Sequence, residues 1–429
     1  MYTITDKLKT ACQIDMEITT ACNHSCRYCY NFWRHKNHKE IFMSKETIDK
    51  IIDNIIKNRV FNVVLTGGEP FTNYDVLLHG VKRLTRAGIL VSCNSNLTLA
   101  TKEKLQELKK AGLPHILTSL ASYDPETNDH IFNKKGSFTK VIQNIINAVQ
   151  AGIKISVNTV VSQYTKDQIY KTGLLVHALG ASNLFLTRVV PNNSCPAGVA
   201  SEFILKPEEY VPVLEEAIRI KKETGITIGS LIQYPVCFLK DPEKYTDFIG
   251  RGCPAGKKMV CISANGEARA CFHEKKSYGN VLEIGIEGVW KNMEKWRNDS
   301  LIPKKCRKCK WLRWCEGGCR IYAKSLDAPD FLCQGPAGLP DPKEDYEKFI
   351  HLIKGGKFKV RKGLRFREEK GFWLTHIIGA WIVKISPRVA EFLKKYERSG
   401  KEFSIKNFPE SEKSLADLLA KKIVEKLND

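Results

Sequence analysis

The sequence lacks any apolar run that approaches the roughly 20 residues needed to span a bilayer. Its beginning, Met-Tyr-Thr-Ile-Thr-Asp-Lys, lacks the apolar core that marks a secretory signal peptide. It also has no long basic tail, because lysine and arginine recur throughout the chain. The first absence excludes a membrane-spanning protein, the second gives no indication of export, and the third points to no single charged binding segment. We therefore expect a cytoplasmic protein without a membrane partner.

Length and charge set broad limits. With 429 residues the chain is long enough for two or three domains, and a hydrophobic fraction of 43% is ordinary for a globular protein. The formal net charge of +21 would attract nucleic acid, an acidic peptide or an acidic protein. A solvated, lysine-rich surface explains the same charge, and we consider nucleic acid the less favoured partner.

Three of the 15 cysteines lie within eight residues. In a chain without export signals, such spacing indicates metal or redox chemistry more often than disulfides. Cys22, Cys26 and Cys29 are spaced CxxxCxxC, with Tyr28 before the last. Iron–sulfur clusters usually take four thiolates, so three ligands leave one iron open to bind a reactant. The alternatives are a structural zinc site and a chance group of core cysteines.

Residues 14 to 226 alternate between short apolar runs and amphipathic helical stretches. Helical periodicity fills the intervals, for example at Lys45–Lys57, Thr101–Lys110 and Phe138–Gln150. This alternation predicts βαβ units and a parallel sheet. Six units are too few for an eight-fold barrel, so the fold class we expect is α/β with an open, partial (β/α)6 barrel. Its chemistry should lie at the C-terminal strand ends. The expected strands are Ile14–Thr19, Asn62–Leu65, Ile89–Ser92, His115–Ser119, Ile153–Thr159 and Leu184–Val189.

Polar and glycine-rich motifs follow these expected strands. The three cysteines follow the first strand, and Gly67-Gly68-Glu69-Pro70 follows the second. The two glycines would let the backbone approach a ligand closely, and Glu69 offers a carboxylate to a cationic group. An ordinary glycine-rich turn is the alternative.

The CxxxCxxC and Gly-Gly-Glu-Pro motifs together resemble the radical S-adenosylmethionine (radical SAM) enzymes. The resemblance implies that Cys22, Cys26 and Cys29 hold a catalytic [4Fe–4S] cluster whose open iron binds SAM. An electron from the cluster then cleaves SAM to a 5′-deoxyadenosyl radical. Relatives often carry Asp where this chain has Ala121. The residues implied to contact SAM or the substrate are Tyr28, Gly67, Gly68, Glu69, Pro70, Asn94, Ser119, Asn158 and Arg188.

The cysteine pattern past residue 226 resembles the SPASM domain of peptide- and protein-modifying radical SAM enzymes. Its features are Gly266-x4-Cys271, a CxxC-x5-C-xxx-C run and a final cysteine. The resemblance implies two auxiliary iron–sulfur clusters, whereas a pair of zinc sites is the alternative. Cys261 is the least secure ligand because its spacing varies among relatives. One cluster would take Cys253, Cys261, Cys271 and Cys319, and the other Cys306, Cys309, Cys315 and Cys333. We expect Cys12, Cys93, Cys195 and Cys237 to be buried core residues, with Cys195 also a candidate neighbour of the substrate channel.

From about residue 341 the pattern changes to a linker helix, three short strands and two helices. This order resembles the winged-helix-like, peptide-binding fold of the pyrroloquinoline quinone biosynthesis chaperone, which binds a leader peptide as an added strand. The alternatives are a cap that completes the SPASM domain and a nucleic-acid-binding winged helix. The expected ranges are Asp341–Ile353 for the linker helix, Leu364–Arg367, Phe372–Ile377 and Ala380–Ile385 for the strands, and Ser386–Arg398 and Ser414–Leu427 for the helices.

The resemblances predict a radical SAM core at 1–235, a SPASM domain at 236–340 and a peptide-recognition domain at 341–429. They imply an enzyme that abstracts hydrogen from a peptide or protein, forming a new bond or an oxidised residue. An electron donor such as ferredoxin or flavodoxin would supply the electron. The alternatives are an anaerobic sulfatase-type maturase, a maturase for a cofactor or metalloenzyme, and a non-enzymatic zinc protein that binds nucleic acid.

Overall fold

The computed structural model describes residues 7–34, 39–190, 202–342, 345–377 and 382–427. The chain forms two compact units. The first unit is Thr10–Leu339, and the second is Pro340–Asp429 together with the short segment that ends at Lys9. Cys195 lies outside the described residues. Among those described, no helix is both long and apolar enough to cross a bilayer.

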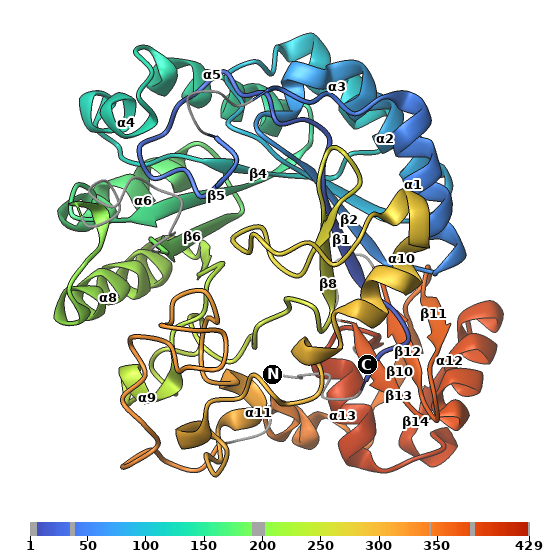
Figure 1. Cartoon of the computed structure of the whole chain (residues 1–429). Helices are drawn as coiled ribbons and strands as arrows, with labels where there is room; N and C mark the ends of the chain where they lie inside the picture. Colours follow the sequence, from blue (N-terminus) through green and yellow to red (C-terminus); the bar gives the residue numbers. More distant parts are fainter. Residues whose placement is uncertain (1–6, 35–38, 191–201, 343–344, 378–381, 428–429) are drawn as a thin grey trace. The chain divides into compact units, whose positions relative to one another are not determined.

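The first unit is built on one sheet of nine strands in the order β7-β6-β5-β4-β3-β2-β1-β8-β9 (Figure 1). Strands β1 to β8 pair in parallel with their neighbours, and β9 is antiparallel to β8. Strands β1 to β6 confirm the predicted partial barrel. The bounds are β1 (Gln13–Glu17), β2 (Asn62–Thr66), β3 (Leu90–Asn94), β4 (His115–Ser119), β5 (Lys154–Val161), β6 (Asn183–Arg188), β7 (Thr227–Gly229), β8 (Met259–Ile262) and β9 (Ala268–Arg269).

Amphipathic helices connect the parallel strands and lie around the sheet (Figure 1). Helix α1 (Lys45–Lys57) begins where the Ser44 side chain accepts a hydrogen bond from the Thr47 backbone, and four of its five isoleucines are buried. The other helices are α2 (Tyr74–Arg86), α3 (Lys102–Lys110), α4 (Pro125–Phe132), α5 (Ser137–Gln150), α6 (Ile169–Ala178), α8 (Pro207–Thr224), α9 (Val236–Leu239), α10 (Val281–Asn292) and α11 (Leu312–Cys315).

The cysteine-rich segment contributes to the same sheet as the barrel. Strand β8 pairs with β1, and this register places Cys261 opposite Asp15. The barrel and the cysteine-rich segment therefore fall in one compact unit. The boundary at residue 235 stays a prediction.

The second unit has its own apolar core and two three-stranded sheets, in the orders β14-β10-β15 and β11-β12-β13. Strands β12 and β13 lie within two predicted strand ranges, β11 ends one residue beyond the third, and helix α12 matches the predicted helix to within one residue at each end. Pro387 lies in its first turn, and the Ser386 side chain caps it by accepting a hydrogen bond from the Val389 backbone. The bounds are β10 (Lys357–Val360), β11 (Arg365–Glu368), β12 (Trp373–His376), β13 (Val383–Ile385), α12 (Pro387–Ser399), β14 (Glu402–Ser404), α13 (Glu412–Ala420) and β15 (Val424–Lys426).

Two helix predictions in this unit are wrong. The expected linker helix is replaced by 3-10 turns at Asp345–Lys348 and Ile350–Leu352. An isolated helix shorter than about 12–15 residues is marginal, and the predicted stretch is no longer than that. The predicted last helix stops at Ala420, and the following residues enter strand β15. The β-branched pair Ile423-Val424 favours that strand, which pairs with β10.

Candidate iron–sulfur and cofactor sites

The loop after β1 brings three free thiols together. The Cys29 backbone donates to the Cys26 carbonyl at 3.1 Å, which tightens the loop, and all three cysteines are partly buried. Burial raises the pKa of Cys22 to about 11 and that of Cys26 well above its ordinary value. In both cases the neighbouring thiols add to the rise, because like charges oppose ionisation. A set of close cysteine sulfurs suits an iron–sulfur cluster, whose positive irons favour the thiolate form.

Arg34 is a residue of this site that the sequence patterns did not reveal. Its guanidinium donates to the His24 carbonyl and also contacts the Cys29 sulfur. Burial lowers the pKa of Arg34, but the charges of Cys22 and Cys29 outweigh that effect and raise it. A fixed cation beside the thiols stabilises their ionised forms, as ligation requires.

Tyr28 anchors the loop to the barrel. Its ring centroid lies 6.3 Å from that of Phe132 and 5.9 Å from that of Phe203, both in edge-on geometry. Ala121 is fully buried in the same apolar cluster. An Asp at that position would bring a charge into this cluster, so Ala121 suits the packing around Tyr28. A direct contact of Tyr28 with the cofactor stays a prediction.

The two glycines of the Gly-Gly-Glu-Pro turn allow it to press against the cysteine loop. A Cβ on Gly67 would lie 2.3 Å from the Thr19 carbonyl oxygen, and one on Gly68 only 2.1 Å from that of Ala21. The turn donates backbone hydrogen bonds to those same two carbonyls. The sequence predicted that these glycines let the backbone approach a ligand. Among the described contacts, they let it approach the chain's own backbone just before the cysteine loop.

Glu69 is completely buried within this turn. Its carboxylate accepts hydrogen bonds from the Phe71 backbone at 3.0 Å, the Ser95 hydroxyl at 2.7 Å and the Asn96 backbone at 2.7 Å. Burial raises the pKa of Glu69 to about 7, against these three donors, which lower it. A carboxylate has about four acceptor positions, so one remains for a further donor such as an ammonium group.

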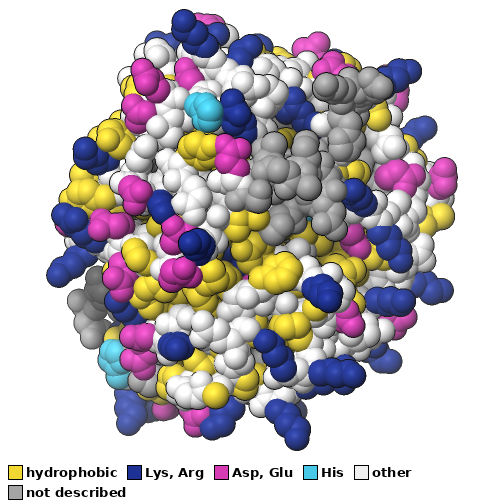
Figure 2. Space-filling view, turned by 60° about the vertical axis from the view of Figure 1, so that its left-hand side comes forward, with side chains coloured by type: hydrophobic (Ala, Val, Ile, Leu, Met, Phe, Trp, Pro, Cys, Tyr) yellow, Lys and Arg dark blue, Asp and Glu magenta, His cyan; other side chains and the backbone are white. Residues whose placement is uncertain are grey.

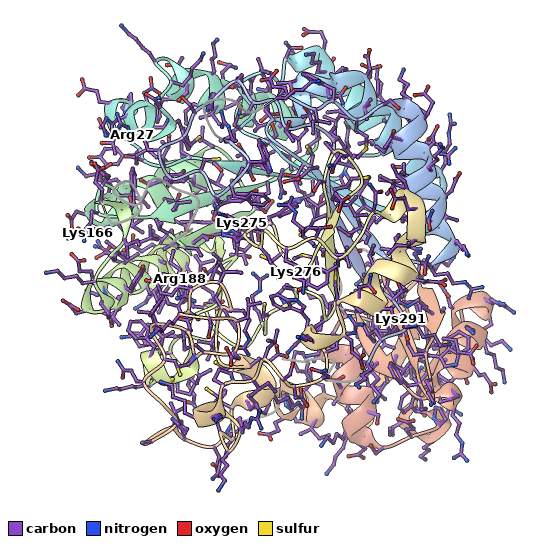
Figure 3. All side chains as sticks on the ribbon, viewed as in Figure 1. Arg27, Lys166, Arg188, Lys275, Lys276 and Lys291 are labelled. Carbon is purple, nitrogen blue, oxygen red and sulfur yellow. The ribbon has the colours of Figure 1, made fainter. Side chains whose placement is uncertain are left out.

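Four further predicted cofactor contacts lie on four other strands. Asn94 ends β3, and Ser119, at the end of β4, is the register partner of Asn158 on β5. Asn158 accepts a hydrogen bond from the Thr187 hydroxyl at 2.5 Å. Arg188, at the end of β6 and labelled in Figure 3, is buried among protein partners. Its guanidinium binds Asp330. All four contacts with SAM or substrate stay predictions.

The thiols of the first predicted auxiliary set influence one another. Burial raises the pKa of Cys271, and the charges of Cys253 and Cys319 raise it further. Burial raises the pKa of Cys261 as well, and Cys271 contributes to that rise. Since such effects act over short distances, Cys271 lies near the other three thiols, and their binding of one cluster stays a prediction.

An aromatic stack links this region to the loop after β1. The Tyr30 and His273 rings lie 4.8 Å apart with their planes at 13°. Tyr30 follows the predicted ligand Cys29, and His273 lies two residues beyond Cys271. A buried ion pair between Arg269 and Glu17, at 2.7 Å, joins the same two segments. The two predicted cluster sites are therefore held in a fixed relation.

The second predicted auxiliary set lines one small cavity. Cys306, Cys309, Cys315 and Cys333 all contribute to its wall, together with Cys237. Cys12 and Cys93 are buried elsewhere, as predicted. Among the described residues, no three His, Cys, Asp or Glu side chains converge on a point that would hold a single metal ion.

Comparisons with known proteins agree with this arrangement. The radical SAM superfamily matches residues 16–175, and an iron–sulfur cluster-binding domain of the SPASM type matches residues 253–310. The chain is 26% identical to an AdoMet-dependent heme synthase of Methanosarcina barkeri, over 75% of this chain and 95% of the relative. It is 28% identical to the mycofactocin maturase MftC of Mycolicibacterium smegmatis, over 76% and 83%. It is 30% identical to a GTP 3′,8-cyclase of Aquifex aeolicus, over 67% and 91%.

A solved structure shows the same fold. The Streptococcus suis protein SuiB, crystallised with its precursor peptide SuiA, superposes with a TM-score of 0.63 at 17% identity, over 77% of each chain. The fold and the paired cluster sites define an iron–sulfur enzyme. The chain belongs to the radical SAM superfamily and carries a SPASM domain. Its cofactors are accordingly a [4Fe–4S] cluster with SAM, and auxiliary iron–sulfur clusters.

Proposed function

We propose that this chain is a radical SAM maturase that removes hydrogen from a peptide or protein substrate, leaving a new bond or an oxidised residue. Cys22, Cys26 and Cys29 hold the catalytic cluster, and the remaining acceptor position of Glu69 receives the ammonium group of SAM. When bound, the cluster and SAM together supply a radical that abstracts hydrogen from an unactivated C–H bond. The two further sets of four cysteines hold the auxiliary clusters.

The second unit carries the argument for a peptide. It lies outside both family matches and has a core of its own, so cluster binding gives it no evident task. In the sheet β11-β12-β13, strands β11 and β13 are the outer strands. An extended peptide binds to such a sheet by adding a strand through backbone hydrogen bonds. A leader segment of the substrate would bind in this way.

The relatives are named for different substrates, and this difference supports one alternative to a peptide substrate, namely a cofactor. The relative from Methanosarcina barkeri, matched over 95% of its length, is named a heme synthase, so a maturase that acts on a cofactor is the second candidate. Lys and Arg side chains are spread among acidic ones over the face shown in Figure 2, so that face identifies no charged substrate. A sulfatase-type maturase would use the same barrel but has less use for a leader-binding unit.

Deuterium transfer distinguishes these possibilities. The protein is reconstituted without oxygen and mixed with SAM, dithionite and a candidate peptide that carries deuterated residues. We expect 5′-deoxyadenosine that contains deuterium, together with peptide that has lost a pair of hydrogens. The Cys22/Cys26/Cys29→Ala variant should form neither, and Cys12→Ala should behave as wild type. Deuterium transfer from a tetrapyrrole in place of every peptide tested would reject the peptide assignment.

A variant that lacks residues 355–429 tests the role of the second unit. We expect it to retain SAM cleavage in the absence of substrate and to lose the stimulation of cleavage by a leader-containing peptide. A peptide without its leader should stimulate wild type and variant equally. If the truncated enzyme processed the full peptide as well as wild type, the second unit would have no part in recognition.

A further inference from the structure

The cavity of the second auxiliary set is lined by five cysteines, although a [4Fe–4S] cluster is held by four. Four of them belong to the predicted set, and the fifth is Cys237, which belongs to no cluster-binding motif. Cys237 lies on the short helix α9, about 70 residues before Cys306. The sequence alone therefore gave no reason to join it to the other four.

The sulfur atoms place Cys237 within the set. The Cys237 Sγ lies 3.6 Å from the Cys333 Sγ, which in turn lies 3.9 Å from the Cys306 Sγ. Cys237 is buried, with 8% of its surface exposed. Val236, Leu312 and Leu339 line the same cavity and make its remaining wall apolar. A buried thiol that faces other thiols in an apolar cavity is placed as a metal ligand is.

Cys333 and Cys237 differ from the other three cysteines in how they reach the cavity. Cys306, Cys309 and Cys315 belong to one short run around helix α11, and all three line the cavity. Cys333 and Cys237 come from separate segments, and their sulfurs lie 3.6 Å apart. If one run supplies three of the four cysteine ligands of a cluster, one ligand position remains. The thiols of Cys237 and Cys333 are the two candidates for it.

We propose that Cys237 and Cys333 share the fourth ligand position of the second auxiliary cluster, so that either can fill it. The proposal rests on the assignment of a cluster to this cavity, and it does not depend on the substrate of the enzyme. When Cys237 takes the position, its sulfur–iron bond replaces that of Cys333. The proton released by Cys237 passes to Cys333, so no electron is gained or lost.

Iron content and electron paramagnetic resonance (EPR) of the reconstituted full-length protein test the proposal without substrate. We expect Cys333→Ser and Cys237→Ser each to keep the iron content of wild type and the EPR signal of the second auxiliary cluster. The Cys237→Ser/Cys333→Ser variant should lose that signal and about two to four irons per chain. The matched control is Cys12→Ala/Cys333→Ser, in which the second changed cysteine is buried just before β1 and does not line the cavity. This control should keep the iron content and the EPR signal.

Two results would overturn the proposal. Loss of the cluster in Cys333→Ser alone would show that Cys237 does not take the position. Retention of the cluster in Cys237→Ser/Cys333→Ser would show that neither thiol is needed. If the double variant does not accumulate, Cys333→Ser decides: full iron with an unchanged EPR signal supports the shared position, and lost iron overturns it. Since no substrate is added, these results are independent of the peptide assignment.

Discussion

Arg188 and Asp330 form an ion pair in which both side chains are fully shielded from solvent. Arg188 Nη1 lies 2.9 Å from Asp330 Oδ1, and the guanidinium also stacks 4.3 Å from the Tyr322 ring. The same carboxylate accepts hydrogen bonds from the backbone of Cys319 at 2.8 Å and of Leu332 at 3.0 Å. One carboxylate thus ties the end of β6 to the backbone of Cys319 and to that of Leu332, which precedes Cys333.

Arg188→Met should therefore destabilise the protein and its auxiliary clusters together. Removing one member of a buried pair leaves an uncompensated charge, which costs roughly 3–5 kcal/mol. Urea unfolding and iron content should both show the loss. The control Arg219→Met breaks an exposed pair with Glu223 and should leave stability nearly unchanged, because exposed ion pairs contribute little. Equal costs for the two variants would contradict the structural role of the buried pair.

Glu69→Gln should weaken SAM binding. The substitution removes the charge that attracts the ammonium group, and the new amide would point a donor at the Asn96 backbone, at a cost of roughly 1–3 kcal/mol. Since Glu69 has a pKa of about 7, SAM affinity of wild type should fall as the pH drops below that value. Equilibrium dialysis with SAM across this range measures it, and the variant should lack the dependence. An identical pH profile in both proteins would exclude Glu69 as the ammonium acceptor.

Gly68→Ala should disturb the cysteine loop. Its Cβ would lie 2.1 Å from the Ala21 carbonyl oxygen, next to the ligand Cys22, so the turn and the loop must separate. We expect reduced iron at the first cluster and SAM affinity lower by about tenfold or more, a change of at least about 1.4 kcal/mol. Gly88→Ala is the control, because its Cβ meets nothing within 4 Å and only its φ of +67° causes strain. Full iron and normal SAM affinity in Gly68→Ala would show that the contact is not needed.

The second unit should lose stability in acid through His376. Burial, with a smaller contribution from Arg365, lowers the pKa of His376 to about 4, below its ordinary value of 6.5. The unfolded chain therefore takes up the proton first, so this contribution is present above pH 6.5 and is lost as the pH falls through about 4. The full loss is about 3 kcal/mol.

Hydrogen exchange of peptides from 357–426, in urea at several pH values, measures that loss. His376→Phe should flatten the dependence between pH 6.5 and 4, whereas the exposed His351→Gln should leave it unchanged. A steep dependence that survived in His376→Phe would assign the acid sensitivity to other groups.

Local patterns predicted the barrel well because its elements depend on short-range signals. Helix α1 begins and ends where its periodicity and its Ser44 cap indicate. The cysteine triad and the Gly-Gly-Glu-Pro turn lie after β1 and β2, since parallel strands bring such loops to one edge. The cavity around Cys306 brings together the four cysteines predicted from the motif.

Features that depend on distant parts of the chain were missed. Strand β8 finds its place only by pairing with β1, which lies about 240 residues earlier. Arg34 and Cys237 reach their sites through folding and follow no motif. Strands β10 and β14 are three or four residues long, too short for alternation to be distinguished from a loop.

The position of β1 between β2 and β8 affects the order in which the strands of the sheet unfold. A strand with partners on both sides exchanges its amide hydrogens only when the sheet opens, whereas β7 and β9 each have a single neighbour and can fray. Under rising denaturant the edges should open first and β1 late. The loop that carries Cys22, Cys26 and Cys29 is attached to this late-opening strand, so partial unfolding will release the periphery while the catalytic cysteines are still held together.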